Sequence, residues 1–113
     1  ITMGRNYINH HIERIQRAIE TEKSKIAESR EDIISTRNRK KSRAESYSYL
    51  IKSTASRGTK ENLRRSKADE WKEFSRIIDR EKEKMASSRE RISEYREELK
   101  RERDKLKNHW QNK

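Results

Sequence analysis

The sequence predicts an all-α protein in which two long helices form an antiparallel coiled-coil hairpin. Three observations support this prediction. Apolar residues recur at steps of three, four and seven along both halves of the chain, which is the heptad pattern of paired helices. The 113 residues include no proline, the strongest helix breaker. The one interior glycine, Gly58, lies near the middle of the chain, where a hairpin must turn.

The composition favours a thin helical protein over a compact domain. Charged residues make up 45% of the chain and hydrophobic residues only 27%, which is too little apolar surface for a core of normal size. Helices satisfy their own backbone hydrogen bonds, so a narrow apolar seam is enough to pair two of them. We therefore expect a single helical-hairpin domain over residues 1–113, which could also dimerise into a helical bundle.

The first helix is expected over about residues 6–55. Its apolar residues occupy the a and d positions of a heptad, and β-branched isoleucine packs well at position a of a paired seam. The expected seam residues of this half are Ile8, Ile12, Ile15, Ile19, Ile26 and Ile33.

The turn is expected at about residues 56–59. Gly58 can adopt the left-handed conformation that ends a helix, and Thr59 can cap the next helix by accepting hydrogen bonds from backbone N–H groups. The second helix should then cover about residues 60–110. Its expected seam residues are Trp71, Phe74, Ile78, Met85, Ile92, Tyr95, Leu99 and Leu106.

An antiparallel hairpin centred on Arg57 sets the register of the two helices. It places Ile15 opposite Leu99, and Glu22 opposite Ile92. Layers near the termini are apolar on both sides, whereas layers near the turn pair an apolar residue with a polar or cationic one. We therefore expect the turn end to be the less stable end of the hairpin.

Two cations fall at seam positions near the turn. This register places Lys40 opposite Phe74 and Arg43 opposite Trp71, with no acid facing either cation. A buried cation without a partner is costly. Either the helices separate here, or the long side chains extend past the aromatic rings with cation–π contact, or an acidic partner helix lies against them.

Positive charge is concentrated in the middle of the chain. Eleven of the 31 lysines and arginines, but only two of the 20 acids, lie between Arg37 and Lys67, so this segment carries +9 of the net charge of +11. Charge runs in helical proteins are usually solvated faces, but the hairpin brings both halves of this run to one end. The cations expected to bind a polyanion are Arg37, Arg39, Lys40, Lys41, Arg43, Arg57, Lys60, Arg64, Arg65 and Lys67.

Two functional hypotheses follow from these patterns. The first is that the basic turn end binds nucleic acid or another polyanion without strong sequence specificity, since lysine and arginine contact phosphates. Tyr47 and Tyr49, with Trp71, could stack on the bases of single strands or belong to the seam. The alternative is a small helical partner or adaptor that completes a bundle with itself or with a larger helical protein.

Other classes of function find no support in the sequence. There is no cysteine, no glycine-rich phosphate loop and no nucleophile motif, so we expect no enzymatic activity and no cofactor. His10 and His11 are adjacent and point in different directions on a helix, so we expect no metal site. No apolar run is long enough to cross a bilayer, and we expect a soluble protein, with the cytoplasm as its compartment.

The size and the helix–turn–helix plan with a glycine at the bend resemble the WXG100-type helical hairpins of type VII secretion. That resemblance implies the adaptor hypothesis. At the bend, this chain has Ser56-Arg57-Gly58 where the family has Trp-x-Gly. Four residues after Tyr95 it has Leu99, where the family's export signal has an acid. The coiled-coil arm of seryl-tRNA synthetase is similar in architecture alone, so no functional residue is carried over from either.

Overall fold

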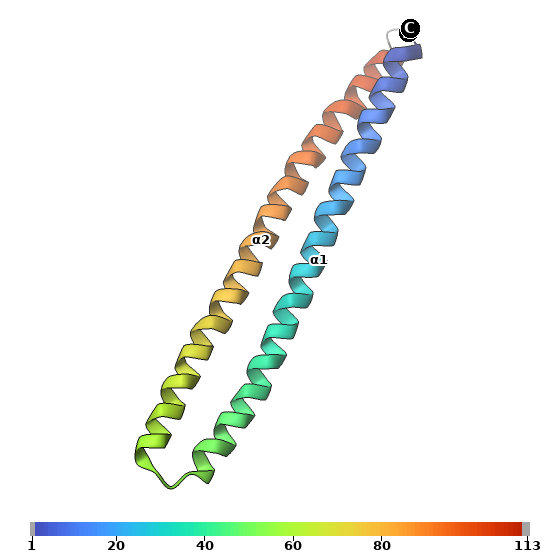
Figure 1. The fold of residues 1–113 in the computed structure, drawn as a ribbon. Coiled ribbons are helices and arrows are strands. Elements are labelled where there is room, and N and C mark those ends of the chain that lie inside the picture. The colour runs from blue at the N-terminus through green and yellow to red at the C-terminus, as the bar shows by residue number, and fades with distance from the viewer. Residues whose placement is uncertain (1, 112–113) are drawn as a thin grey trace. The chain divides into compact units, whose positions relative to one another are not determined.

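The computed structural model of the protein describes residues 2–111 and consists of two long helices (Figure 1). Helix α1 covers Thr2–Ser53 and helix α2 covers Arg57–Gln111, and residues 54–56 connect them. The prediction of an all-α protein built from two long antiparallel helices is confirmed. Helix α1 begins and ends a few residues earlier than expected, and helix α2 begins three residues earlier and ends one residue later than expected.

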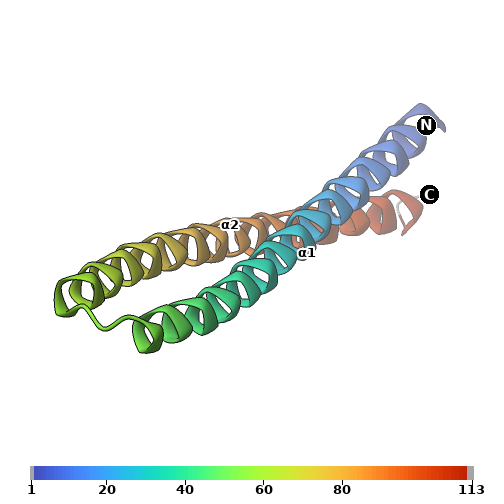
Figure 2. The same ribbon diagram turned by 60° about the horizontal axis from the view of Figure 1, so that its bottom comes forward.

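The chain divides into two compact units, each formed by one segment of α1 and one of α2. Unit 1 comprises Ile1–Ala27 and Lys84–Lys113, and unit 2 comprises Glu28–Glu83. In unit 2 the two segments run in opposite directions on either side of the connection, as Figure 2 shows. Unit 2 therefore holds the whole basic segment, and unit 1 holds the residues near both termini.

The seam of unit 1 contains the isoleucine and leucine residues that the heptad pattern selected. Its six buried apolar members are each at most 8% exposed: Ile15, Ile19, Ile26, Met85, Ile92 and Leu99. Ile8, Ile12, Tyr95 and Leu106 are half-buried. The apolar stripe of each helix therefore faces the other helix, as a coiled-coil seam requires.

The seam of unit 2 is shorter and more aromatic. Ile33 and Phe74 are buried, whereas Trp71 and Ile78 are half-buried. Tyr47, at the heptad a position nearest the connection, is only 5% exposed. Aromatic side chains thus complete the seam where the isoleucines end.

Polar residues occupy several buried d positions. In unit 1 the carboxylate of Glu22 is 5% exposed and accepts hydrogen bonds from Ser88 and from Lys25, the latter at 3.1 Å. Arg91 of α2 lies 3.4 Å from the same carboxylate. The hydrogen bond from Ser88, followed by the contributions of Lys25 and Arg91, lowers the pKa of Glu22 although burial opposes the shift. This buried acid is therefore held in its charged form by both helices.

The connection between the helices differs from the predicted turn. The hydroxyl of Ser56 accepts a hydrogen bond from the backbone N–H of Thr59 at 3.3 Å, and its carbonyl accepts one from Lys60 at 3.1 Å. Ser56 is therefore the N-cap of α2, and Gly58 lies inside its first turn. No described glycine has a positive φ. The predictions that Gly58 ends the first helix and that Thr59 caps the second are wrong, because Ser56 offers an equally good cap three residues earlier.

The earlier cap also changes the register. The connection is centred on Ala55, two residues before the predicted centre at Arg57. Glu22 accordingly meets Ser88, one helical turn before the predicted Ile92. The sequence register is thus correct to within about one turn, and the remaining difference arises from where the helix begins.

Candidate polyanion-binding surface

Unit 2 contains all ten cations that the sequence selected for polyanion binding. Six of them are exposed and make no ion pair or hydrogen bond through their side chains to any residue between 4 and 109. We call these six the loop-end cations: Arg37, Arg39, Lys41, Arg57, Arg64 and Arg65. Arg57, Arg64 and Arg65 lie in the first nine residues of α2, and Arg37, Arg39 and Lys41 lie 12–16 residues before the end of α1 at Ser53.

Trp71 is the centre of a cluster that holds two of the other cations. The ammonium group of Lys40 lies 5.6 Å from the centroid of the Trp71 ring, and that of Lys67 lies 5.3 Å from it. Tyr47 and Phe74 pack edge-on against the same indole, at 6.2 and 5.7 Å between centroids. Lys40 therefore makes the cation–π contact that was one of the three alternatives for it.

Arg43 has an acidic partner that the predicted register did not show. Its Nε and Nη2 atoms donate to the two carboxylate oxygens of Glu70 at 3.0 and 3.3 Å. Its guanidinium also lies 5.0 Å from the centroid of the Tyr47 ring. The expectation that no acid faces Arg43 is therefore wrong, because Glu70 lies beside the predicted partner Trp71 and reaches across the seam.

The hydroxyl of Tyr47 completes this polar group. It acts as a hydrogen-bond donor to Glu70, which lowers the pKa of Glu70 together with Arg43 and raises the pKa of Tyr47. The hydrogen bond to Glu70, and a smaller one to Tyr47, raise the pKa of Arg43 above its usual range. The three side chains therefore form one charge-assisted network across α1 and α2.

Nine of the ten predicted cations thus fall into two groups with different roles. Lys40, Arg43 and Lys67 contact aromatic rings or Glu70 and stabilise the packing of unit 2. Lys60 is half-buried near the start of α2. The loop-end cations remain available to an external anion. Sequence reasoning missed Glu70 because it tested only a and d positions, whereas Glu70 lies at a position that flanks the seam.

The aromatic residues also separate into structural and accessible ones. Tyr47 is buried and cannot stack on a base without opening the seam. Tyr49, two residues further along α1, is 71% exposed. Of the three aromatic residues proposed for stacking, Tyr49 is therefore the one whose ring is open to a ligand, while Trp71 is half-buried.

The first turn of α2 is electrostatically unusual. The positive end of a helix dipole normally attracts acidic residues. This turn contains no acid, and Arg57 and Lys60 lie within or beside it. Cations at this end raise the local positive potential, so an anion bound there would relieve an unfavourable interaction.

Two histidines of unit 1, His10 and His11, lie close to carboxylates. The Nε2 atom of His11 lies 3.1 Å from Glu98 and 3.9 Å from Glu102, and His10 lies 3.9 Å from Glu13. Within the described residues, no group of three or more such side chains is arranged to hold a metal ion. Neither described helix contains a stretch that is both long and apolar enough to span a membrane.

Comparisons of the chain with models of protein families, with curated proteins and with solved structures found no match. The resemblance to WXG100-type hairpins therefore remains one of architecture and transfers no residue role. The candidate surface rests on the charge, exposure and contacts of the residues described above.

Proposed function

We propose that this protein binds nucleic acid or another polyanion through its loop-end cations, without strong sequence specificity. The observation that carries the proposal is that six exposed arginines and lysines of unit 2 have no acidic partner within residues 4–109. Cations that only kept the protein in solution would gain from local ion pairs, as Arg76 does with Glu73 at 2.9 Å. These six instead leave a local excess of positive charge.

Phosphate groups are the natural ligand for such a surface. Each lysine or arginine that contacts a phosphate releases condensed counterions, and this release drives binding at low salt. The first turn of α2 adds to the attraction, because its dipole and Arg57 both favour an anion. Contacts of this kind carry no direct sequence information, so affinity should depend on charge and shape more than on base sequence.

The proposal is tested by the salt dependence of binding to a short labelled oligonucleotide, measured by fluorescence anisotropy. If about six phosphates are contacted, the logarithm of the binding constant should fall with the logarithm of salt concentration with a slope of about −5. A variant that replaces four loop-end cations, Arg37→Gln, Lys41→Gln, Arg64→Gln and Arg65→Gln, should bind more weakly and with a shallower slope.

A matched control removes the same charge from unit 1. It replaces four exposed cations outside unit 2: Arg14→Gln, Arg17→Gln, Arg101→Gln and Lys107→Gln. The control should keep most of the affinity and the slope. Equal losses in both variants, or binding that does not respond to salt, would refute the proposal.

The adaptor hypothesis is the alternative outcome of the same work. The isoleucine and leucine residues that it would use, such as Ile19 and Leu99, are already buried between the two helices. A partner that completed a bundle through them would have to displace one helix. A stoichiometric complex that resists salt and is lost in Ile19→Asp would favour this alternative over polyanion binding.

A further inference from the structure

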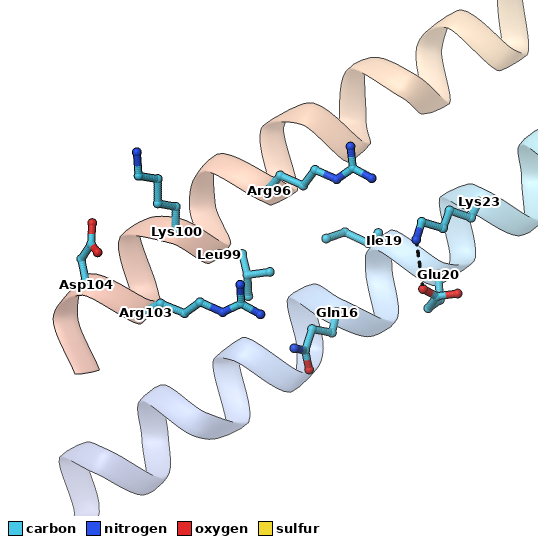
Figure 3. A pocket seen from close by; sticks show the side chains of 9 residues that line it. All are labelled: Gln16, Ile19, Glu20, Lys23, Arg96, Leu99, Lys100, Arg103 and Asp104. Carbon is cyan, nitrogen blue, oxygen red and sulfur yellow. Dashed lines mark hydrogen bonds and ion pairs between the residues drawn. The ribbon is translucent and has the colours of Figure 1, made fainter. Parts of the chain in front are cut away.

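A second basic region lies in unit 1, where the two helices form a groove beside the seam (Figure 3). Its floor is formed by Ile19 and Leu99, and its two walls carry Lys23 from α1 and Arg96 and Arg103 from α2. This seam-side groove does not share any residue with the loop-end cations. Its complete lining consists of Gln16, Ile19, Glu20, Lys23, Arg96, Leu99, Lys100, Arg103 and Asp104.

The heptad explains why cations collect on this side of the seam. Lys23 directly follows the d residue Glu22, and Arg96 and Arg103 follow the d residues Tyr95 and Glu102, so all three are e positions. In an antiparallel pair, the e positions of the two helices face each other. Lys23 is not directly opposite Arg96, since its neighbour Glu22 meets Ser88, but cations from both helices line this side of the seam, where natural coiled coils normally place charges that attract.

On the other side of the same seam, basic side chains contact acidic side chains of the opposite helix. There His11 contacts Glu98, and Arg91 contacts Glu22. On the groove side, Arg96 and Arg103 make no side-chain hydrogen bond or ion pair with any residue from 4 to 109. Lys23 is held only by Glu20 of its own helix, at 3.5 Å. The acids of the lining are Glu20 and Asp104, and neither forms an ion pair with Arg96 or Arg103.

The side chains are also oriented for a ligand in the groove. Figure 3 shows Arg96 and Arg103 extending from α2 toward α1, while Lys100 and Asp104 point away from α1. The two guanidinium groups belong to residues seven positions apart, which corresponds to about 10 Å along a helix. This spacing matches acidic side chains that recur every seven residues along a second helix.

The chain itself carries acids with the same period. A repeat of cation, acid, any residue and apolar residue occurs at 89–92, 96–99 and 103–106. Its acids, Glu90, Glu97 and Asp104, are exposed and have no side-chain partner among the described residues. We call them the acidic stripe. Glu97 and Asp104 directly follow the groove arginines Arg96 and Arg103, so stripe and groove share a seven-residue spacing and lie next to each other on α2, with Asp104 also at the edge of the groove.

We propose that a second copy of this chain docks its acidic stripe into the seam-side groove. A two-fold arrangement would let each copy supply one stripe and one groove, so that both contacts close within a dimer. Each acid would then lie near an arginine of the other copy in a charge-assisted pair. The complex should weaken as salt is raised, because the pairs are at the surface.

The test is the solution mass, measured by light scattering or sedimentation across a range of protein and salt concentrations. The wild-type chain should form a dimer at low salt. A groove variant, Arg96→Glu with Arg103→Glu, and a stripe variant, Glu90→Lys with Glu97→Lys, should each be monomeric. An equimolar mixture of the two variants should regain the dimer, because each reversed surface then meets its opposite.

Three controls make the result interpretable. Circular dichroism of each variant checks that both helices remain folded, and Arg14→Glu with Arg17→Glu changes the same charge on the outer face of α1 without affecting the mass. A monomeric wild type, or variants that do not pair when mixed, would overturn the proposal.

A groove variant that stays dimeric but loses oligonucleotide binding would also overturn it, because the groove would then be a polyanion site. The four-fold glutamine variant of the loop-end cations should still dimerise, so this proposal and the proposed function fail independently.

Discussion

The guanidinium of Arg43 on α1 donates two hydrogen bonds to the carboxylate of Glu70 on α2, at 3.0 and 3.3 Å. This pair joins the two helices of unit 2 at the position where the apolar seam becomes cationic. Tyr47 adds its hydroxyl to the carboxylate and its ring to the guanidinium. A cation that would be costly in the seam is thus neutralised locally, and it is not available to an external anion.

The Arg43–Glu70 pair predicts a specific acid sensitivity. The hydrogen bonds from Tyr47 and Arg43 lower the pKa of Glu70 below its ordinary value of 4.5, so the charged carboxylate is more favourable in the folded state than in the unfolded state. This contribution is present above pH 4.5 and is lost as the pH falls toward the lower folded pKa. Glu70→Gln should therefore reduce stability at neutral pH and flatten the loss of stability on acidification.

Thermal unfolding monitored by circular dichroism from neutral pH down to the acid range measures this effect. Glu45→Gln removes one exposed acid from the same unit and is the matched control. The wild type and the control should lose stability in parallel, with Glu22, whose pKa is also lowered, contributing to both curves. If Glu70→Gln follows the same pH profile as the control, the ion pair does not contribute to stability.

Two adjacent isoleucines on α1 separate burial from helix propensity. Ile33 is 7% exposed and Ile34 is 52% exposed. Ile33→Ala should lower the free energy of unfolding by about 2–4 kcal/mol, because it removes buried methyl groups from the seam. Ile34→Ala should change it by less than about 0.5 kcal/mol, because alanine has at least as high a helix propensity at an exposed position. Urea unfolding of both variants checks the comparison. Equal losses in the free energy of unfolding would contradict the placement of Ile33 in the seam.

The cap of α2 gives a prediction whose sign distinguishes the observed turn from the expected one. Gly58 has helical geometry, and an added Cβ would meet only the hydroxyl of Ser56 at 4.0 Å. Gly58→Ala should therefore stabilise the protein by up to about 1 kcal/mol. Ser56→Ala should destabilise it by about 1 kcal/mol, because it removes the cap. A destabilising Gly58→Ala would instead support a left-handed residue at the turn.

Tyr49 should distinguish single strands from duplexes. Its ring is 71% exposed and lies two residues from the buried Tyr47. If bases stack on it, Tyr49→Ala should weaken the binding of a single-stranded oligonucleotide by about tenfold, which is within the range for one base–aromatic contact. Binding of a duplex of equal length should change little, since its bases are already stacked. Equal effects on both ligands would show that Tyr49 does not stack on bases.

The heptad pattern predicted the seam because each residue type has a strong preference in this fold. Ile15, Ile19 and Leu99 stabilise the fold only when they are buried against another apolar surface. A long helix without proline places such residues in one apolar stripe that can pair with a second helix. The position of the turn was predicted less accurately. Several residues near Gly58 can cap a helix, and the choice of Ser56 over Thr59 depends on small differences in backbone hydrogen bonding.

The candidate surface, too, was predicted in part from the sequence and in part only from the structure. The sequence alone identified the segment that carries the excess charge, since net charge depends on composition and not on geometry. It could not separate Lys40, Arg43 and Lys67 from the loop-end cations. That separation depends on which side chains reach Glu70 and the ring of Trp71 across the seam.

The sequence by itself determined that this protein forms two long helices, which residues face the seam, and where positive charge is concentrated. These properties follow from periodicity and composition, which act locally along the chain. Only the tertiary structure decided the register, the cap at Ser56 and the network of Arg43, Glu70 and Tyr47. Such contacts join residues far apart in the chain and depend on side-chain reach, so a shift of one helical turn selects different partners.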